Sequence, residues 1–517
     1  MANTLNLGDG NWGVKDSSLL GYAKDNTKFL PETFDVTRAS SGTRVNKAGL
    51  IETVEEVLSG ELVTNGDFSD GATDWTLGGN WSVVDGKATS NASGLIQQST
   101  NELIIGETYK TSFEITEYTS GSVKLYSGSG SDTSYYQNTV GTHAVYFVAN
   151  GGTTSLYSNS FIGSIDNISI VQVEIENLAR IDYTDGPEGV LLTEPQSTNT
   201  TIHSQAVSDL EFFNTSDATY TVTDNYTTSP DGEINASRYQ VSRGISGGSY
   251  SLIKTGNIGT GDVTISFYAK SLTGVNQNLL SYIPDAGAGE VFVVTSEWKR
   301  FVVSGNQATN NIALIGTRGG SGDFFNGGDQ NLDIAVWGIQ TENLSYATSY
   351  MPTYGQIASR AGDVVNNGGD VSNFNSEEGT LFIEAKGLVN GGGFRFVSLS
   401  SSSSNRIRLG FSSTANQISV LAQVDGSIIY NNGNVETSVS HNDVQKLALT
   451  YGSSGTKLYS NGVLAYSNVL DSSFVNTFTS ATFDDGNSTN PFYGKTKNIQ
   501  VFNEALTDAE LITLTTI

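Results

Sequence analysis

The sequence contains no cysteine, and its three histidines are His143, His203 and His441. The lack of cysteine excludes disulfides and thiolate metal sites. The histidines are far apart in the sequence and show no metal-ligand spacing, so we expect each to be an ordinary surface or sheet residue. With so few histidines, no Ser-His-Asp arrangement can be predicted either.

Basic residues are also scarce. The chain has 26 lysines and arginines against 53 aspartates and glutamates, and its formal net charge is −27. Such a surface repels phosphate backbones and anionic lipids, so we expect neither nucleic-acid binding nor membrane insertion. No apolar run approaches the ~20 residues of a transmembrane helix. Residues 1–12 lack a basic region followed by an apolar core, so no secretory signal is predicted.

Glycine and aromatic residues are abundant, with 58 Gly, 23 Tyr and 23 Phe. Short runs rich in Val, Ile, Tyr, Phe and Thr alternate with Gly, Asn, Asp and Ser, which is typical of β-sandwiches or barrels. A chain of 517 residues is expected to form roughly three or four domains. We therefore predict an all-β fold with three β-sandwich (jelly-roll) domains in tandem and an N-terminal extended anchoring segment.

Residues 34–54 predict a hairpin with turns at Ser41-Gly42 and Ala48-Gly49. They contain the motif TRASSGTRVNKAGLIE. A second motif, RIDYTDGPEGVLLTEPQSTN, follows much later, at residues 180–199. The two halves resemble one continuous module found near the start of virion fibre and appendage proteins of tailed bacteriophages. The resemblance implies that a whole domain is inserted into the module and that residues 37–54 and 180–199 lie together in space.

The resemblance to this module also determines two of the predicted domains. We assign residues 1–60 to an N-terminal virion-anchoring arm and hairpin, and residues 177–200 to the return of the anchoring module. Residues 1–60 have too few apolar side chains to offset the cost of backbone ordering. We therefore expect this segment to become ordered against a partner.

Residues 61–176 are predicted to be the inserted sandwich. It begins ELVTNGDFS and ends IDNISI, which resembles the carbohydrate-binding-module superfamily with a jelly roll that starts L-x-NGDFS…W and ends IDNVSV. In that family the first and last strands lie near a structural calcium site, which implicates Asp67 and Asp166 as ligands. The alternative is that both carboxylates only hydrogen-bond turns.

Residues 201–365 are predicted to be a second carbohydrate-binding-module-like sandwich. Its markers are ISFYAK, TSEWKRFVV and LDIAVWGIQ, followed by TSYMPT. They resemble the module that follows the EPQ-x-TN segment in phage appendage proteins. Side chains of a strand point alternately to its two faces, and this alternation along LDIAVWGIQ indicates that Trp337 is a packing residue.

Residues 366–517 are predicted to be the third sandwich. Asn461-Gly462 indicates a tight hairpin, and TDAE at 507–510 indicates a capping box that starts a short helix. The segment resembles the concanavalin A-like (laminin G-like) jelly roll, a family of lectins, glucanases and structural modules. Glucanases of this family alternate catalytic carboxylates along one strand. Because Glu377-Glu378 are adjacent and Asp484-Asp485 sit in a Gly/Asn turn, we predict no catalytic residue.

Sugar sites in sandwiches combine a flat aromatic ring with amide and carboxylate groups. The candidate carbohydrate-binding residues on this basis are Trp75, Trp81, Tyr135, Tyr136, Tyr430 and Asn431. The alternative for the tryptophans is core packing, and tyrosine and asparagine are common in turns.

These observations predict a bacteriophage virion appendage, on the tail or the capsid surface, that binds host-surface glycans weakly and multivalently and is not an enzyme. The N-terminal segment would contact other virion proteins, the fibre would be a homotrimer, and a structural calcium would be its one cofactor. The alternatives are a capsid head fibre or decoration protein with a purely structural role, a polysaccharide depolymerase (glycoside hydrolase), and an extracellular adhesin.

Overall fold

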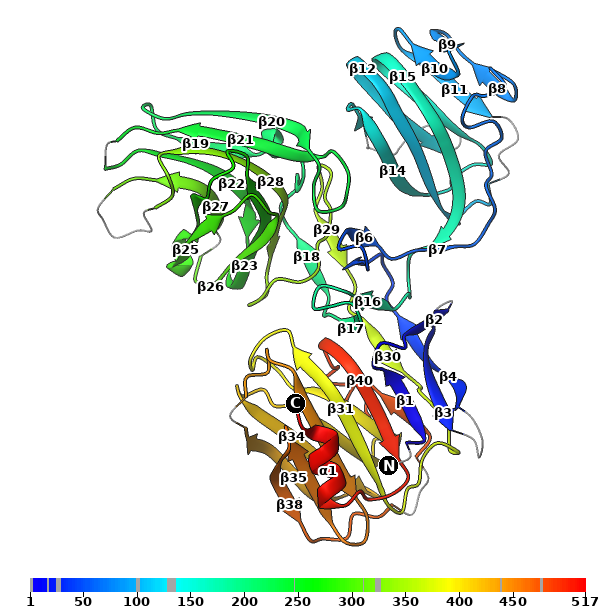
Figure 1. The fold of residues 1–517 in the computed structure, drawn as a ribbon, viewed down its shortest axis with the longest axis vertical. Helices are drawn as coiled ribbons and strands as arrows, with labels where there is room; N and C mark the ends of the chain where they lie inside the picture. The colour runs from blue at the N-terminus through cyan, green and yellow to red at the C-terminus, as the bar shows by residue number, and fades with distance from the viewer. Residues whose placement is uncertain are drawn as a thin grey trace. The chain divides into compact units, whose positions relative to one another are not determined.

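The computed structural model describes residues 3–15, 18–24, 29–98, 103–127, 136–245, 247–309, 311–320, 327–437, 439–474 and 478–517. Nearly all of its regular structure is β, which confirms the predicted fold class (Figure 1). The chain forms two compact units: the first comprises Met1–Val54, Glu176–Ser197 and Arg360–Ile517, and the second Glu55–Ile175 and Thr198–Ser359. No helix in the described part of the chain is long and apolar enough to cross a membrane.

The first unit contains a sandwich of two sheets. The order of the larger sheet is β30 (Val364–Asn366), β4 (Phe29–Thr37), β3 (Ser18–Lys24), β1 (Leu5–Gly8), β40 (Gly494–Phe502), β31 (Gly379–Gly387), β36 (Gln445–Tyr451), β37 (Thr456–Ser460) and β38 (Val463–Asn468). Three further strands join it, namely β2 (Gly13–Lys15), β16 (Arg180–Asp182) and β17 (Val190–Thr193). The smaller sheet has the order β35 (Ser427–Glu436), β34 (Gln417–Val424), β33 (Asn405–Phe411), β32 (Arg395–Ser402) and β39 (Ser480–Thr482).

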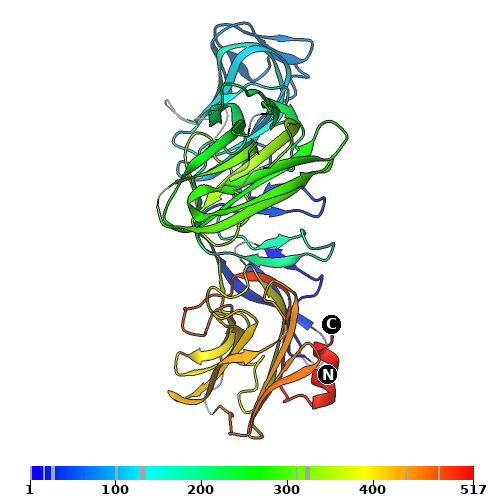
Figure 2. The same ribbon diagram turned by 90° about the vertical axis from the view of Figure 1, so that its left-hand side faces the viewer.

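The core of this sandwich is formed by alternate residues of facing strands, as expected for a pleated strand. Leu381 and Ile383 of β31 and Ile407 and Leu409 of β33 are fully buried in one cluster. Helix α1 (Asp508–Thr515) packs with Leu511 against Phe382, Tyr459 and Phe502, on the opposite side of the larger sheet (Figure 2). The helix begins with the predicted capping box at Thr507 and Glu510.

The N-terminal segment is part of this sandwich, and it is not a separate arm. Strand β1 pairs antiparallel with β40, with Leu5 opposite Val501 and Leu7 opposite Ile499 (Figure 1). Leu5 and Leu7 are fully buried in the same core cluster. The described residues of this segment are therefore ordered against their own chain, which corrects the expectation that they require a partner.

The hairpin of β5 (Thr43–Val45) and β6 (Ile51–Thr53) lies beside the returning segment. The Tyr183 amide donates a hydrogen bond to the Val45 carbonyl at 3.0 Å, and the Arg180 guanidinium donates to the Thr43 carbonyl at 3.2 Å. Residues 37–54 and 180–199 are thus neighbours, as the resemblance implied.

The second unit contains two separate groups of strands. In residues 55–175 one nine-stranded sheet comprises β7 (Glu56–Val57), β8 (Trp75–Leu77), β9 (Trp81–Val84), β10 (Lys87–Ser90), β11 (Gly94–Gln98), β12 (Thr108–Ser127), β13 (Tyr136–Gln137), β14 (Gly141–Val148) and β15 (Thr154–Glu174). Strands β12 and β15 pair along most of their length with several bulges. Strand β7 pairs with the end of β15, so this insertion begins and ends at neighbouring positions.

Residues 198–359 form a sandwich of two five-stranded sheets. One has the order β19 (Glu211–Asn214), β22 (Tyr250–Ile258), β27 (Asn311–Arg318), β24 (Gln277–Ile283) and β25 (Ala288–Val294). The other has the order β20 (Thr219–Thr227), β21 (Ala236–Ser242), β28 (Asn331–Glu342), β23 (Gly261–Ser271) and β26 (Lys299–Gln307). The remaining elements are the pair β18 (Ser197–Asn199) and β29 (Ala358–Arg360), and the 3-10 turns η1 (Val207–Asp209) and η2 (Pro284–Ala286).

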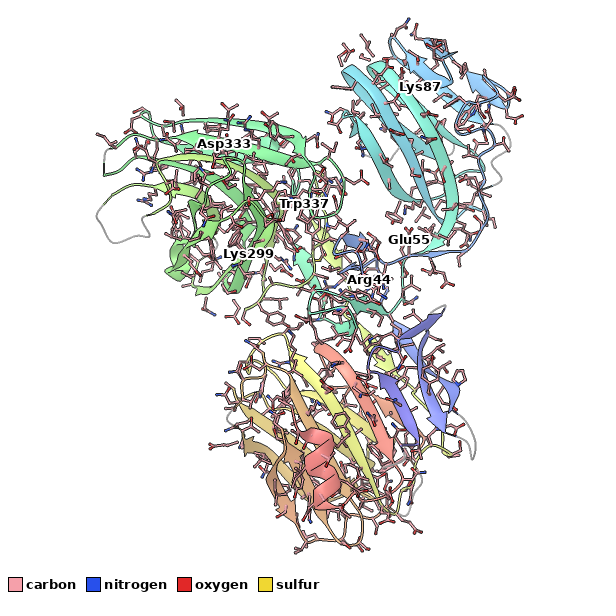
Figure 3. The ribbon with its side chains drawn as sticks, viewed as in Figure 1. Arg44, Glu55, Lys87, Lys299, Asp333 and Trp337 are labelled. Atoms are coloured by element: carbon pink, nitrogen blue, oxygen red, sulfur yellow. The ribbon has the colours of Figure 1, made fainter. Side chains whose placement is uncertain are left out.

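Trp337 on β28 is fully buried, which confirms its predicted packing role (Figure 3). Its ring lies 4.4 Å from that of Tyr350 and 5.6 Å from that of Tyr268. The next residue, Gly338, has a φ of 63°. This left-handed residue interrupts the strand alternation, and Ile339 consequently returns to the sandwich core.

Five charged side chains form a buried cluster in the first unit: Arg38, Arg180, Glu194, Arg360 and Asp363, each at most 4% exposed. Arg38 contacts Asp363 at 2.8 Å, and Arg180 and Arg360 contact Glu194 at 2.6 and 2.9 Å. Arg180 also pairs with Asp363. The cluster thereby ties together all three segments that make up the unit.

Arg180→Ala is expected to destabilise the first unit by about 3–5 kcal/mol, because two buried carboxylates lose a charged partner. The matched control is Arg44→Ala, since the Arg44–Glu52 pair is 26% and 37% exposed (Figure 3). A pair of this exposure contributes at most about 1 kcal/mol. Hydrogen exchange of first-unit peptides during urea unfolding, read by mass spectrometry, measures both effects. Equal losses in the two variants would contradict the role assigned to the cluster.

Candidate functional site

The two candidate tryptophans of residues 55–175 differ in exposure. Trp75 is half-buried, its ring lies 5.3 Å from Phe68, and its indole N–H donates to the Asn65 carbonyl at 2.9 Å. Trp81 is only 6% exposed and packs 6.2 Å from Phe161 in the core. A sugar cannot stack on a ring with buried faces, so the prediction that Trp81 binds carbohydrate is wrong.

The tyrosine pair of residues 55–175 is only half described. Tyr136 is 51% exposed, and the Lys124 ammonium lies 5.1 Å from its ring centroid. Tyr135 lies outside the described residues. Carbohydrate binding by either tyrosine stays a prediction.

Tyr430 and Asn431 point to opposite sides of β35, as neighbours on a strand do. Tyr430 is 5% exposed and belongs to the core, with its ring 6.1 Å from that of Tyr466. Its predicted sugar contact is therefore wrong for the same reason as for Trp81. Asn431 is exposed and lies opposite Leu421, on the outer face of the smaller sheet.

Asp67 lies in a turn and Asp166 in strand β15, and the two segments meet, because the Ile168 amide donates to the Gly66 carbonyl at 2.9 Å. Asp67 Oδ1 accepts hydrogen bonds from the hydroxyl and the amide of Ser69, which lower the pKa of Asp67. Two carboxylates fall short of the six to eight oxygens that calcium takes, and no group of three or more His, Cys, Asp or Glu occurs among the described residues. Calcium stays a prediction, which a calorimetric calcium titration would test.

A polar site that the sequence did not reveal lies on the outer face of the smaller sheet of the first unit. In β33, Ile407 and Leu409 face the core, so Arg406 and Arg408 point to the other side. Arg406 lies opposite Ser400 and Gln423, and Arg408 lies opposite Ser398 and Leu421. We call this surface the outer-face site, defined by Phe394, Phe396, Arg406, Arg408, Gln423, Asn431 and Asp485.

Asp485 belongs to the loop that follows β39, and this loop folds against the outer face. A Cβ placed on Gly486 would lie 3.1 Å from the Ser398 hydroxyl and 3.3 Å from Cδ of Arg406. The Asp485 carboxylate accepts hydrogen bonds from the amides of Asn487 and Thr489 at 3.1 and 3.2 Å. The Thr489 hydroxyl donates a further one at 2.7 Å. The loop thus holds this carboxylate in place with its own donors.

The two arginines are held differently. Arg406 donates to the Asp485 carbonyl at 2.8 Å and to the Gln423 amide oxygen at 3.3 Å. Arg408 instead lies over the Phe396 ring, with Cζ 4.2 Å from the centroid. Burial, together with the neighbouring charge of Arg406, lowers the pKa of Arg408. Phe394 stacks on the far end of this group, 5.6 Å from Phe396, and is 39% exposed.

This arrangement suits binding better than catalysis. Planar guanidinium and amide groups beside an accessible aromatic ring are what oriented hydroxyl-rich ligands require. The two acidic side chains near the site, Asp484 and Asp485, are both engaged by donors of their own loop, including the amide of Gly486.

His441 lies at one end of the same sandwich and is fully buried, which corrects the expectation of an ordinary surface or sheet residue. Its ring stacks on Phe411 at 4.6 Å. Nδ1 accepts a hydrogen bond from the Gly391 amide at 3.2 Å, and Nε2 lies 2.8 Å from the Gln417 carbonyl, to which an Nε2–H can donate. A second proton, on Nδ1, would oppose the Gly391 N–H, and burial lowers the pKa of His441 below its ordinary value.

The lowered pKa of His441 predicts a pH-dependent stability of the first unit. Its contribution is complete above about pH 6.5, the unfolded value, and is lost as the pH falls from there through the folded value. His441→Gln should therefore flatten the dependence of the unfolding free energy on pH between about 5 and 7. Hydrogen exchange in urea at several pH values measures this slope for first-unit peptides. His143→Gln, in the other unit, is the control, and an unchanged slope in His441→Gln would refute the assignment.

Comparison with known proteins supports the fold of the C-terminal part. Residues 370–512, which include Phe394 to Asp485, match the concanavalin A-like lectin/glucanases superfamily. The chain matches none of the curated proteins with which it was compared.

Solved structures give only distant likenesses. Domain 4 of AbnA, a GH43 extracellular arabinanase from Geobacillus stearothermophilus in complex with arabinotriose, is 15% identical, with a TM-score of 0.26, over 34% of this chain and 84% of that one. The CBM22-1-CBM22-2 tandem domain of Paenibacillus barcinonensis Xyn10C is 12% identical, with a TM-score of 0.20, over 56% and 99%. A Trypanosoma rangeli sialidase mutant is 11% identical, with a TM-score of 0.23, over 97% and 92%. At these scores the likenesses carry no functional argument.

Proposed function

We propose that this protein binds carbohydrate through the outer-face site and does not hydrolyse it. The observation that carries the proposal is the position of this site. Arg406, Arg408 and the exposed ring of Phe394 lie on one sheet face of the very sandwich that matches the lectin/glucanase superfamily. The absence of hydrolysis in this proposal is supported by Asp484 and Asp485, whose carboxylates accept hydrogen bonds from their own loop.

The protein in this proposal is a structural appendage of a tailed-phage virion, on the tail or the capsid surface. It is supported by the TRAS…GLIE and RIDY…EPQSTN motifs. The two motifs are hydrogen-bonded to each other through Val45 and Tyr183, despite the insertion between them. Several weak sites carried on one homotrimeric particle component would give avidity that one site lacks. The second candidate, a polysaccharide depolymerase, is favoured only by the glucanases within the matched superfamily.

Glycan binding is tested with the purified protein on an array of bacterial surface polysaccharides, followed by calorimetry on the best ligand. Phe394→Ala is expected to weaken binding at least about tenfold, because a stacking surface is lost. Val463→Ala is the control, since Val463 is 66% exposed on β38 of the other sheet. Release of reducing ends from a bound polysaccharide would favour the depolymerase, and no binding to any glycan would refute the proposal.

The appendage role is tested separately by labelling intact phage particles with an antibody against residues 198–359. Label on the tail or on the capsid surface is expected, and the two positions distinguish a tail fibre from a head fibre or decoration protein. Light scattering of the purified protein measures the predicted trimer. Particles that carry no label, while control virion proteins are detected, would contradict the appendage role and leave the glycan-binding result unaffected.

A further inference from the structure

We infer that the sugar recognised at the outer-face site carries an acidic group, a carboxylate or a sulfate ester, which binds Arg408. This inference rests on the proposed function, because it names the class of carbohydrate that the same site takes. It depends on one unusual property of the site, the unused hydrogen-bonding capacity of a largely buried arginine.

Arg408 has no hydrogen-bond acceptor within the part of the protein that the structure describes. Its side chain is only 13% exposed, and its Nε is buried without a partner. A guanidinium carries five N–H donors, and buried donors are nearly always satisfied in folded proteins. The terminal nitrogens Nη1 and Nη2 are not among the buried atoms, and they are the donors that an acceptor on a ligand would engage.

Asp485 does not fill this role. Its Oδ2 lies 3.6 Å from Nη1 of Arg408 and 3.5 Å from Nη1 of Arg406, which exceeds an ordinary N–H···O hydrogen bond. The carboxylate is instead satisfied by Thr489 and by the Asn490 amide at 3.3 Å. Asp484 is likewise occupied, by the Thr482 hydroxyl at 2.8 Å. Asp485 therefore offsets part of the charge of the two arginines, but it leaves the donors of Arg408 without a hydrogen bond at ordinary distance.

The sheet itself holds Arg408 in a position to receive a ligand. Gly410 lies opposite Phe396, and a Cβ at this glycine would come within 1.8 Å of the Arg395 carbonyl oxygen. The sheet therefore has a glycine directly opposite Phe396, and Arg408 contacts the face of the Phe396 ring. Because one face of the guanidinium is covered, its in-plane N–H groups remain for the ligand. A planar fork of this kind matches carboxylate and sulfate oxygens better than it matches single hydroxyls.

Two matched pairs of oligosaccharides test the inference: oligogalacturonate against its methyl ester, and sulfated carrageenan oligosaccharides against neutral agarose oligosaccharides. Short chains are used because the protein carries a net charge of −27, which repels long polyanions. Calorimetry should show at least about tenfold tighter binding of one acidic member than of its neutral partner. The pair that shows it distinguishes a carboxylate from a sulfate.

Arg408→Gln should abolish this preference, because the acidic member loses at least about tenfold in affinity and then binds no more tightly than its neutral partner in the same variant. The control is Arg238→Gln, an outward arginine of the second sandwich that is already paired with Asp333 at 2.8 and 2.6 Å (Figure 3). Should Arg408→Gln fail to fold, Arg408→Lys keeps the charge, loses the fork and should lose most of the preference. Equal binding of acidic and neutral members by the wild type would overturn the inference and leave the proposed function standing. Absence of binding to every glycan would refute both.

Discussion

The fold of the first unit depends on one buried ionic cluster. Arg38, Arg180 and Arg360 come from three segments that are far apart in sequence, and they share the carboxylates of Glu194 and Asp363. A buried guanidinium that loses its carboxylate keeps the cost of desolvation without the compensating attraction, so the segments must assemble together. The chain leaves the unit soon after Glu194 and returns at Arg360. The cluster therefore fixes where the chain leaves the unit and where it re-enters. The intervening residues 198–359 can vary in sequence without disturbing the unit.

Much of the fold was predictable from local signals. The turn at Asn461-Gly462 has φ values of 50° and 82°, as a tight hairpin requires, and the box at Thr507 caps α1. The contact between the two halves of the interrupted module was also predictable, because each half carries the sequence motif on which the resemblance rests. The pairing of β1 with β40 was not. Residues 5–8 have a weak pattern, and nothing local indicates a partner that lies at residues 498–501.

The site was harder to predict than the fold, because it depends on which face of a strand is covered. Trp81 and Tyr430 have the side chains of a sugar site, but the sheets bury both of them. Arg406 and Arg408 alternate with apolar residues along the strand, a pattern typical of any strand with one solvent-exposed face. Their significance comes from the loop of Asp485, which satisfies its own carboxylate, and from Gly410, which lies directly opposite Phe396. Neither condition can be inferred from strand periodicity.

The position of β1 between β3 and β40 also determines the order in which the protein can be made. During synthesis β1 is made long before β40, and the pairing of these two neighbours is complete only after residue 501 has left the ribosome. Residues 55–175 and 198–359 contain the partners of their own strands and can fold earlier, as domains of a growing chain do. The first unit is thus a late-closing structure, in which the core around Leu5 and Leu7 stays open until β40 has left the ribosome.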